Sequence, residues 1–367
     1  MDLKKTIKSV LWFDEPAPNS EFTINNEKRA AEYDVRKEKE PEKDVYVSGD
    51  IERDLSYIKN RFSYPLNNDI VIREIMLKEN RKAFVVFIDG MVSAEAVNES
   101  IIKTLLEIPY FTDDKIYRYE TEIMEKFIAH SQAQATESMD NTAEEINFGS
   151  CAVFVDGVKK AFVFDVRSWE HRSVEKPETE QSIYGPQEAF SEMLRTNTSL
   201  VRKIIKTEKL IAEGVKIGNV SKTRGVILYI NDIANDNLVS EVRRRIKSID
   251  MDYIISIEEV EMMLEEHTFM ATAQLMSTER PDRVARALTE GRVALILNGN
   301  PHVLIFPSSI FETGHAVSDN YLRVPYANMA RIIRLIALFV SILLPAMYLA
   351  ATLYHHEIIP TYLLYSI

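Results

Sequence analysis

Apolar positions along the chain fall into two kinds of pattern, helical spacings and short continuous runs. The first helical spacing begins after Ser48 or Asp50, either of which can cap a helix. Four apolar residues then recur every three or four positions and predict a helix with one buried face: Ile51, Leu55, Ile58 and Phe62. A continuous apolar run over 82–90 ends in Asp-Gly and predicts a buried strand, and Ser93 begins the next helix.

Two further segments each predict a β-hairpin. Apolar runs at 151–155 and 161–166 are separated by Asp156-Gly157, and runs at 293–297 and 303–306 follow the same plan around Asn298-Gly299. Asp-Gly and Asn-Gly favour tight turns because both tolerate positive φ. The two segments resemble each other. Either duplication or shared turn chemistry would produce this resemblance, and we favour shared turn chemistry.

The remaining pattern predicts alternating helices, strands and loops. Gly185-Pro186 opens a long helix, because proline fits the first helical turn. The other expected elements are polar loops at 131–147 and 170–184, strands at 225–230 and 253–257, and helices from Asp236, at 258–266 and at 282–290.

These elements predict an α/β fold of two small subdomains followed by a transmembrane helix. Residues 1–47 are rich in charge and proline and are expected to form a flexible arm. The first subdomain is expected over 48–206, the second over 207–310, and a juxtamembrane linker over 311–334.

The segment 335–354 contains 20 residues without a charge, enough for a helix of about 30 Å. Arg331 and Arg334 precede it, whereas residues 355–367 contain no Lys or Arg, so the positive-inside bias predicts a cytoplasmic N-terminal region. The start of the chain has no apolar stretch of secretory length, which agrees with this expectation. Residues 355–367 are expected to begin a membrane region that is truncated in this sequence.

Composition narrows the possible functions. The 367 residues carry 44 Lys and Arg against 56 Asp and Glu, a net charge of -12, which disfavours nucleic-acid binding. Only 11 Gly occur, and no glycine-rich phosphate motif is present. The single cysteine, Cys151, lies in an apolar run, which favours a core residue over a reactive thiol.

The sequence indicates no catalytic constellation, cofactor or metal site. The seven His do not show metal-ligand spacing, and no nucleophile motif occurs. His355, His356 and Glu357 form a polar cluster at the membrane boundary. Their pattern favours a polar end to the membrane helix, or a pH-sensing role, over metal binding.

Two charged segments are candidate contact sites. Arg280, Asp282, Glu290 and Arg292 flank one short helix, where they either hold it to its neighbour or contact a ligand or subunit. The basic run 243–247 ends a predicted helix, where it forms either a solvated face or a contact with anionic lipid.

Several stretches together resemble the GerA-type spore germination proteins, specifically the A subunit of the germinant receptor. They cover most of residues 48–367 and include YGPQEAFSEMLRTNTSLVRKII (184–205), TERPDRVARALTEGRVALILNGNPHVLIFP (278–307) and IIRLIALFVSILLPAMYLA with YHHEIIPTYLL near the C-terminus.

The resemblance implies a non-enzymatic protein of the spore inner membrane whose N-terminal domain faces the cytoplasm. It also implies B- and C-type receptor subunits as partners, a homo-oligomer, contact with membrane lipid, and a part in nutrient-triggered ion release. Members of the family continue with further membrane helices after the position where this sequence ends.

Two other hypotheses remain open. YLRVPYAN with YHHE also resembles the paralogue called stage V sporulation protein AF, an accessory germination protein. A membrane-anchored enzyme would need a deep polar pocket with convergent titratable groups.

Overall fold

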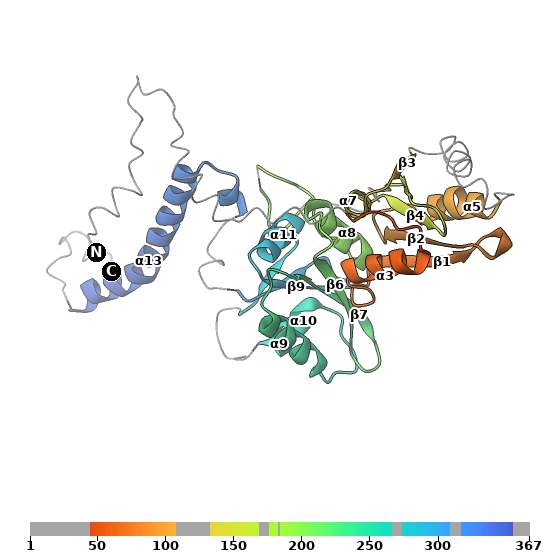
Figure 1. The fold of residues 1–367 in the computed structure, drawn as a ribbon. Coiled ribbons are helices and arrows are strands. Elements are labelled where there is room, and N and C mark those ends of the chain that lie inside the picture. Colours follow the sequence, from red (N-terminus) through yellow and green to blue (C-terminus); the bar gives the residue numbers. More distant parts are fainter. Residues whose placement is uncertain are drawn as a thin grey trace, which may run out of the picture. The chain divides into compact units, whose positions relative to one another are not determined.

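The computed structural model describes residues 45–107, 133–168, 176–182, 184–265, 274–308 and 317–354 (Figure 1). Residues 1–44 of the expected arm (1–47) and the expected membrane segment 355–367 lie outside these residues. The described chain forms two compact units, one holding both β-sheets and the other holding the C-terminal helix α13 (Val324–Tyr354).

The first sheet contains five antiparallel strands in the order β1-β2-β4-β5-β3. Its second strand, β2, lies between β1 and β4 and is the apolar run predicted at 82–90. Alternate β2 side chains enter cores on the two faces of the sheet. The strands are β1 (Ile70–Met76), β2 (Lys82–Ile88), β3 (Ala133–Thr136), β4 (Cys151–Val155) and β5 (Ala161–Phe164).

Helices cover both faces of this sheet. One face carries α3 (Ile51–Arg61) and α7 (Met139–Asn147), and the other carries the continuous helical segment α4 (Ala94–Ala96), η2 (Val97–Ile102) and α5 (Lys103–Glu107). Asp50 caps α3, because its carboxylate accepts the amides of Glu52 and Arg53. A short turn, η1 (Lys78–Asn80), joins β1 to β2.

The second sheet repeats this plan with the order β6-β7-β9-β10-β8. One face packs against α8 (Leu194–Ile204) and α11 (Pro281–Thr289), and the other against α9 (Asp236–Lys247) and α10 (Ile257–Leu264). The strands are β6 (Leu210–Ile217), β7 (Thr223–Ile230), β8 (Met276–Thr278), β9 (Val293–Leu297) and β10 (Val303–Phe306).

The two halves share more than their hairpins. In each half, strands taken in chain order stand as 1-2-4-5-3, with helices before the first strand, between the second and third, and between the third and fourth. Turn chemistry fixes only the last two strands of each set. The explanation of the resemblance by turn chemistry alone is therefore wrong, because the whole topology is repeated.

The structure corrects three expected elements. The segment 131–147 contains β3 and α7 rather than only a loop: Ser138 caps α7, whose Met139, Ala143 and Ile146 are buried. The helix expected from Pro186 begins at Leu194, after an irregular segment. No strand forms at 253–257. Just before this segment, the carbonyls of Met251 and Asp252 accept hydrogen bonds from the β6–β7 turn.

Two expected boundaries also move. Val45 and Val47 exchange backbone hydrogen bonds with residues 137–139, so the first subdomain begins before Ser48. Helix α8, expected in the first subdomain, packs its Leu200 and Val201 on the second sheet, because its apolar face matches that core.

The C-terminal unit is dominated by α13, preceded by the short turn η5 (Val317–Asn320). The helix is long and apolar enough to cross a membrane, and none of its most apolar stretch is buried within the described chain. It begins at Val324, so the second half of the expected linker is helical, and it contains Pro345.

Candidate functional site

Arg280 and Asp282 meet at the start of α11, where Pro281 occupies the first helical turn. Arg280 is fully buried, and its Nε and Nη2 donate to the two Asp282 carboxylate oxygens at 3.1 and 3.1 Å. The remaining donors of Arg280 reach the carbonyls of Glu180 at 3.1 Å and Pro186 at 2.8 Å. The guanidinium therefore fastens α11 to the chain that leads into α8.

Glu279, next to Arg280, strengthens the same attachment. Its Oε1 accepts the Thr179 amide at 2.6 Å, the Thr179 hydroxyl at 2.8 Å and the Glu180 amide at 2.7 Å. Burial raises the pKa of Glu279, but these hydrogen bonds outweigh burial and hold the pKa below its usual value. The Glu180 carboxylate in turn pairs with Arg283 and accepts the Thr278 hydroxyl.

Glu290 and Arg292 lie at the other end of α11. Arg292 Nη2 is 3.1 Å from Glu290, and Arg286 Nε is 3.2 Å from the same carboxylate. Glu290 is half-exposed, so these pairs contribute little to stability. Of the four predicted residues, Arg280 thus pairs with Asp282 at the N-terminal end of α11, and Arg292 pairs with Glu290 at its C-terminal end.

A buried polar cluster joins the two sheets, and sequence analysis did not single it out. Arg202 of α8 donates from Nε to Asp69 at 3.0 Å and from Nη2 to the Asn67 side chain at 3.0 Å and the Leu210 carbonyl at 3.1 Å. Asp69 and Asn67 precede β1 in the first half. Arg195, two turns earlier on α8, donates to the other Asp69 oxygen at 3.0 Å.

The backbone continues this junction. Asn68 donates its amide to the Ala212 carbonyl at 2.9 Å, and Ala212 donates to the Asn67 side chain at 3.2 Å. Arg61 of α3 lies 3.3 Å from Glu208, which also accepts from Asn147 at 3.2 Å. The two sheets are thus joined through charged and amide groups that are largely withdrawn from water.

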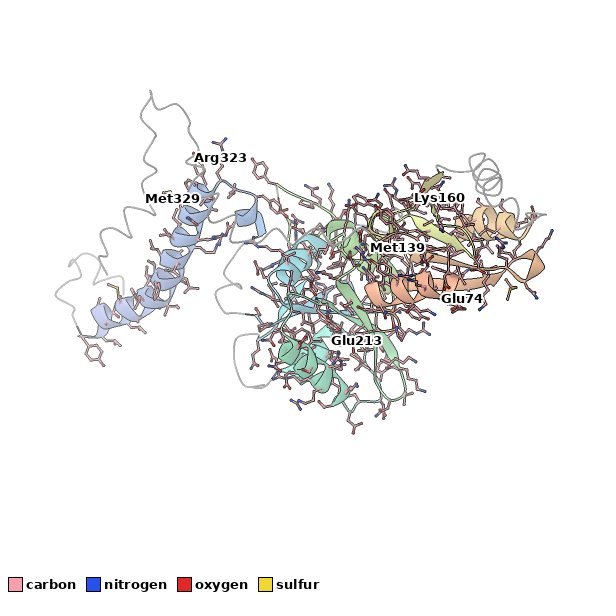
Figure 2. All side chains as sticks on the ribbon, in the orientation of Figure 1. Glu74, Met139, Lys160, Glu213, Arg323 and Met329 are labelled. Carbon is pink, nitrogen blue, oxygen red and sulfur yellow. The ribbon has the colours of Figure 1, made fainter. Side chains whose placement is uncertain are left out.

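The basic run 243–247 is paired within its own subdomain. Arg243 forms a bidentate ion pair with Glu213 of β6 (labelled in Figure 2). Its Nε and Nη2 each donate to one carboxylate oxygen at 2.7 Å. Arg244 and Arg245 share Glu241 and hold the pKa of that carboxyl at about 2.

At the expected membrane boundary, Arg331 and Arg334 converge on Asp319. Arg334 donates to the carboxylate at 2.9 and 3.3 Å, and Arg331 Nε lies 3.9 Å from it. Asp319 is buried, and it belongs to η5, directly before α13. The two arginines are one turn apart and so reach the same group. His355, His356 and Glu357 lie outside the described residues.

The described residues offer little for chemistry. Among them no group of three or more His, Cys, Asp or Glu is placed to hold a metal ion. Cys151 is fully buried in the first sheet, and burial raises the pKa of its thiol well above the usual value. This placement confirms the prediction of a core residue.

The fold is therefore that of a two-sheet α/β domain, with buried ion pairs between the sheets, followed by a candidate membrane-spanning helix. The family model described as "Bacillus/Clostridium GerA spore germination protein" matches residues 56–367. The chain belongs to the GerA family, as its sequence motifs predicted.

Individual relatives agree with this assignment. The chain is 34% identical over 331 residues to spore germination protein KA of Bacillus subtilis, covering 89% of this chain and 60% of that protein. It is 31% identical over 258 residues to stage V sporulation protein AF of the same organism, covering 70% of this chain and 51% of that protein. It therefore spans about 60% of the length of spore germination protein KA.

A solved structure has the same fold. The N-terminal domain of the A subunit of the Bacillus megaterium spore germinant receptor GerK3 superposes with a TM-score of 0.56 at 28% identity, covering 73% of this chain and 98% of that chain.

Proposed function

We propose that this chain is an A-type subunit of a spore germinant receptor, which takes part in nutrient-triggered germination and ion release without chemistry of its own. The observation that carries the proposal is the match of its two-sheet domain to an A-subunit N-terminal domain, together with 34% identity to spore germination protein KA over 89% of the chain. In this proposal B- and C-type subunits and further copies of the chain are its partners.

The geometry supports a coupling role for the two-sheet domain. A signal that passes through a protein must change the relative free energies of two states. The Asp69–Arg202 cluster fixes one arrangement of the two sheets, and Arg280 and Glu279 fix the chain that enters α8. A domain braced in this way transmits displacement rather than absorbing it.

The proposed location is the spore inner membrane, with the two-sheet domain on the cytoplasmic side. Arg323, Arg331 and Arg334 precede the apolar stretch of α13, as the positive-inside rule requires for this orientation. Membrane-impermeant maleimide should label a Val220→Cys variant only after spheroplasts are permeabilised, since Val220 is exposed and Cys151 is buried. Labelling of intact spheroplasts would contradict the orientation.

The alternative function is that of an accessory germination protein resembling stage V sporulation protein AF, and 31% identity over 70% of the chain favours it as second candidate. A receptor subunit acts for particular nutrients, whereas an accessory component acts downstream of every receptor. The two functions therefore predict different germination profiles.

The deciding experiment compares spores with and without the gene across amino acids, sugars and nucleosides. A receptor subunit predicts loss of germination with one nutrient class. A wild-type copy and an Arg244→Gln copy should both restore it, because Arg244 is exposed and its one ion pair among the described residues is with Glu241. Slower germination with every nutrient would favour the accessory role. Unchanged germination with every nutrient would refute both.

A further inference from the structure

A basic hollow opens on one face of the second sheet, beside the N-terminal end of α8. It measures about 360 Å³ and is floored by β6 and β7. Lys216 and Arg224 stand directly opposite each other on these antiparallel strands, and both side chains are exposed. Gly214 also lines the hollow, and the Asn68 side chain, another lining residue, lies where a Cβ at Gly214 would stand.

The charge of the hollow is not balanced locally. Of the residues that line it, Arg195, Lys216 and Arg224 are basic, and none is Asp or Glu. Arg195 is paired with Asp69 and Asp89, whereas Lys216 and Arg224 form no ion pair with any residue that the structure describes. Like charges opposite each other on paired strands repel, so a carboxylate placed between them would relieve the repulsion.

The opposite face of the same sheet carries complementary charge on α10. Glu258 and Glu261 are one turn apart and, unlike Glu259 and Glu265, accept no backbone amide within the described chain. Burial, with the charges of Glu265 and Glu258, raises the pKa of Glu261. Glu258 and Glu261 therefore form no ion pair with any residue that the structure describes.

These two surfaces cannot meet within one molecule. Helix α10 packs on the face that holds Ile227 and Tyr229, whereas the hollow adjoins Val226 on the other face. A second copy displaced along the sheet normal can bring its α10 to the hollow of the first. Such a contact joins different patches on the two copies, and its repetition produces a ring or a filament.

We propose that the hollow at Lys216 and Arg224 receives Glu258 and Glu261 on α10 of a second copy, so that the chain assembles head to tail. The proposal rests on the homo-oligomer of the proposed function and names its interface. A second copy is favoured over a free anion, because the chain itself carries two carboxylates, Glu258 and Glu261, that match the two cations of the hollow in number.

The test is a charge exchange in the full chain, purified in detergent micelles. Three variants are compared: Lys216→Glu with Arg224→Glu, Glu258→Lys with Glu261→Lys, and all four changes together. Lys78→Glu with Lys103→Glu is the matched control for the first variant, because both residues are exposed on the first half and the net charge changes by the same amount as in Lys216→Glu with Arg224→Glu. Circular dichroism and thermal melting establish that each variant folds.

Each double variant should raise the dissociation constant of the oligomer about tenfold or more by light scattering, because like charges then face each other. The fourfold variant should recover most of the wild-type affinity, and the control should match wild type. Unchanged masses in both double variants, or a fourfold variant no better than they are, would overturn the proposal.

A loss of assembly confined to the Lys216 and Arg224 variant would assign the hollow to another carboxylate- or phosphate-bearing partner and would also overturn it. The germination profile of the deletion strain is a separate measurement. Failure of the proposed function is therefore distinguishable from failure of this interface.

Discussion

Arg202 Nε lies 3.0 Å from Asp69 Oδ2, and the side chains of Arg202 and Asp69 are only 2% and 0% exposed. The pair joins helix α8, which packs on the second sheet, to the residue that precedes β1 in the first sheet. Withdrawing two charges from water costs much of the energy that their attraction returns. We infer that the pair mainly specifies how the two sheets meet.

Replacing Arg202 with Ala should destabilise the two-sheet domain by about 3 kcal/mol, because buried Asp69 and Asn67 then lose a charged partner. Arg195 still contacts Asp69 at 3.0 Å, which keeps the loss at the lower end of the range for buried pairs. Urea unfolding of the full chain in micelles, followed by circular dichroism, measures the change.

Arg244→Ala is the matched control for this experiment. Arg244 is exposed on α9, and within the part of the chain that the structure describes its ion pair is with neighbouring Glu241, so its loss should change stability by less than about 0.5 kcal/mol. If both substitutions lowered the free energy of unfolding equally, the buried Arg202–Asp69 pair would contribute no more to stability than an exposed pair.

The Glu279 carboxylate gives the domain an acid-sensitive attachment. Because the pKa of Glu279 is lower in the folded chain than the usual value of a glutamate, the stabilisation it gives is complete above that usual value and is lost as the pH falls through the lowered pKa. Glu279→Gln should cost about 1–2 kcal/mol at pH 7.

The difference between wild type and Glu279→Gln should shrink as the pH falls below 4.5, which urea unfolding at several pH values can follow. Glu290→Gln removes a half-exposed carboxylate at the other end of α11 and serves as control. A difference that is constant from pH 7 to acid would contradict the ionised role of Glu279.

Asp319 holds Arg331 and Arg334 against η5 at the start of α13. Asp319→Asn removes the charge that both arginines share and should loosen η5 without unfolding the helix. In a Ser318→Cys background, thiol labelling should become about tenfold faster, as expected for an opening made easier by about 1.4 kcal/mol.

Arg323→Gln is the control. Arg323 lies between η5 and α13 (labelled in Figure 2) and has no ion pair among the described residues. Equal labelling rates in Asp319→Asn and the parent chain would show that the pairs do not restrain η5.

The elements that could be predicted from sequence are those whose signal is local. β2, the two hairpins and the capped helix α3 combine continuous or periodic apolar positions with Asp, Ser or Gly at their ends. The helix α7 was missed because its nine residues carry few large apolar side chains, and β3 because its short polar strand is set by pairing with β5.

The junction between the sheets could not be predicted for a different reason. Asp69 and Arg202 are separated by 133 positions, and no local sequence motif around either residue indicates its ion-pair partner. Arg280 and Asp282 were singled out because they are close in sequence, but their attachment to Glu180 and Pro186 depends on the fold. Local spacing indicates a pair, whereas only the assembled sheets decide which charges become buried.

The thiol of Cys151 should not react with thiol reagents in the folded chain. Its side chain is fully buried on β4, and burial raises the pKa of the thiol, so both access and the thiolate fraction are small. Ellman's reagent should therefore react with Cys151 only as fast as the domain unfolds, and urea should accelerate the reaction. A Tyr184→Cys variant supplies the control, since Tyr184 is 60% exposed and its replacement thiol should react at once in native buffer. Comparable rates at both thiols in native buffer would contradict the burial of Cys151. They would also remove the basis for the labelling experiments above, which require that Cys151 does not react.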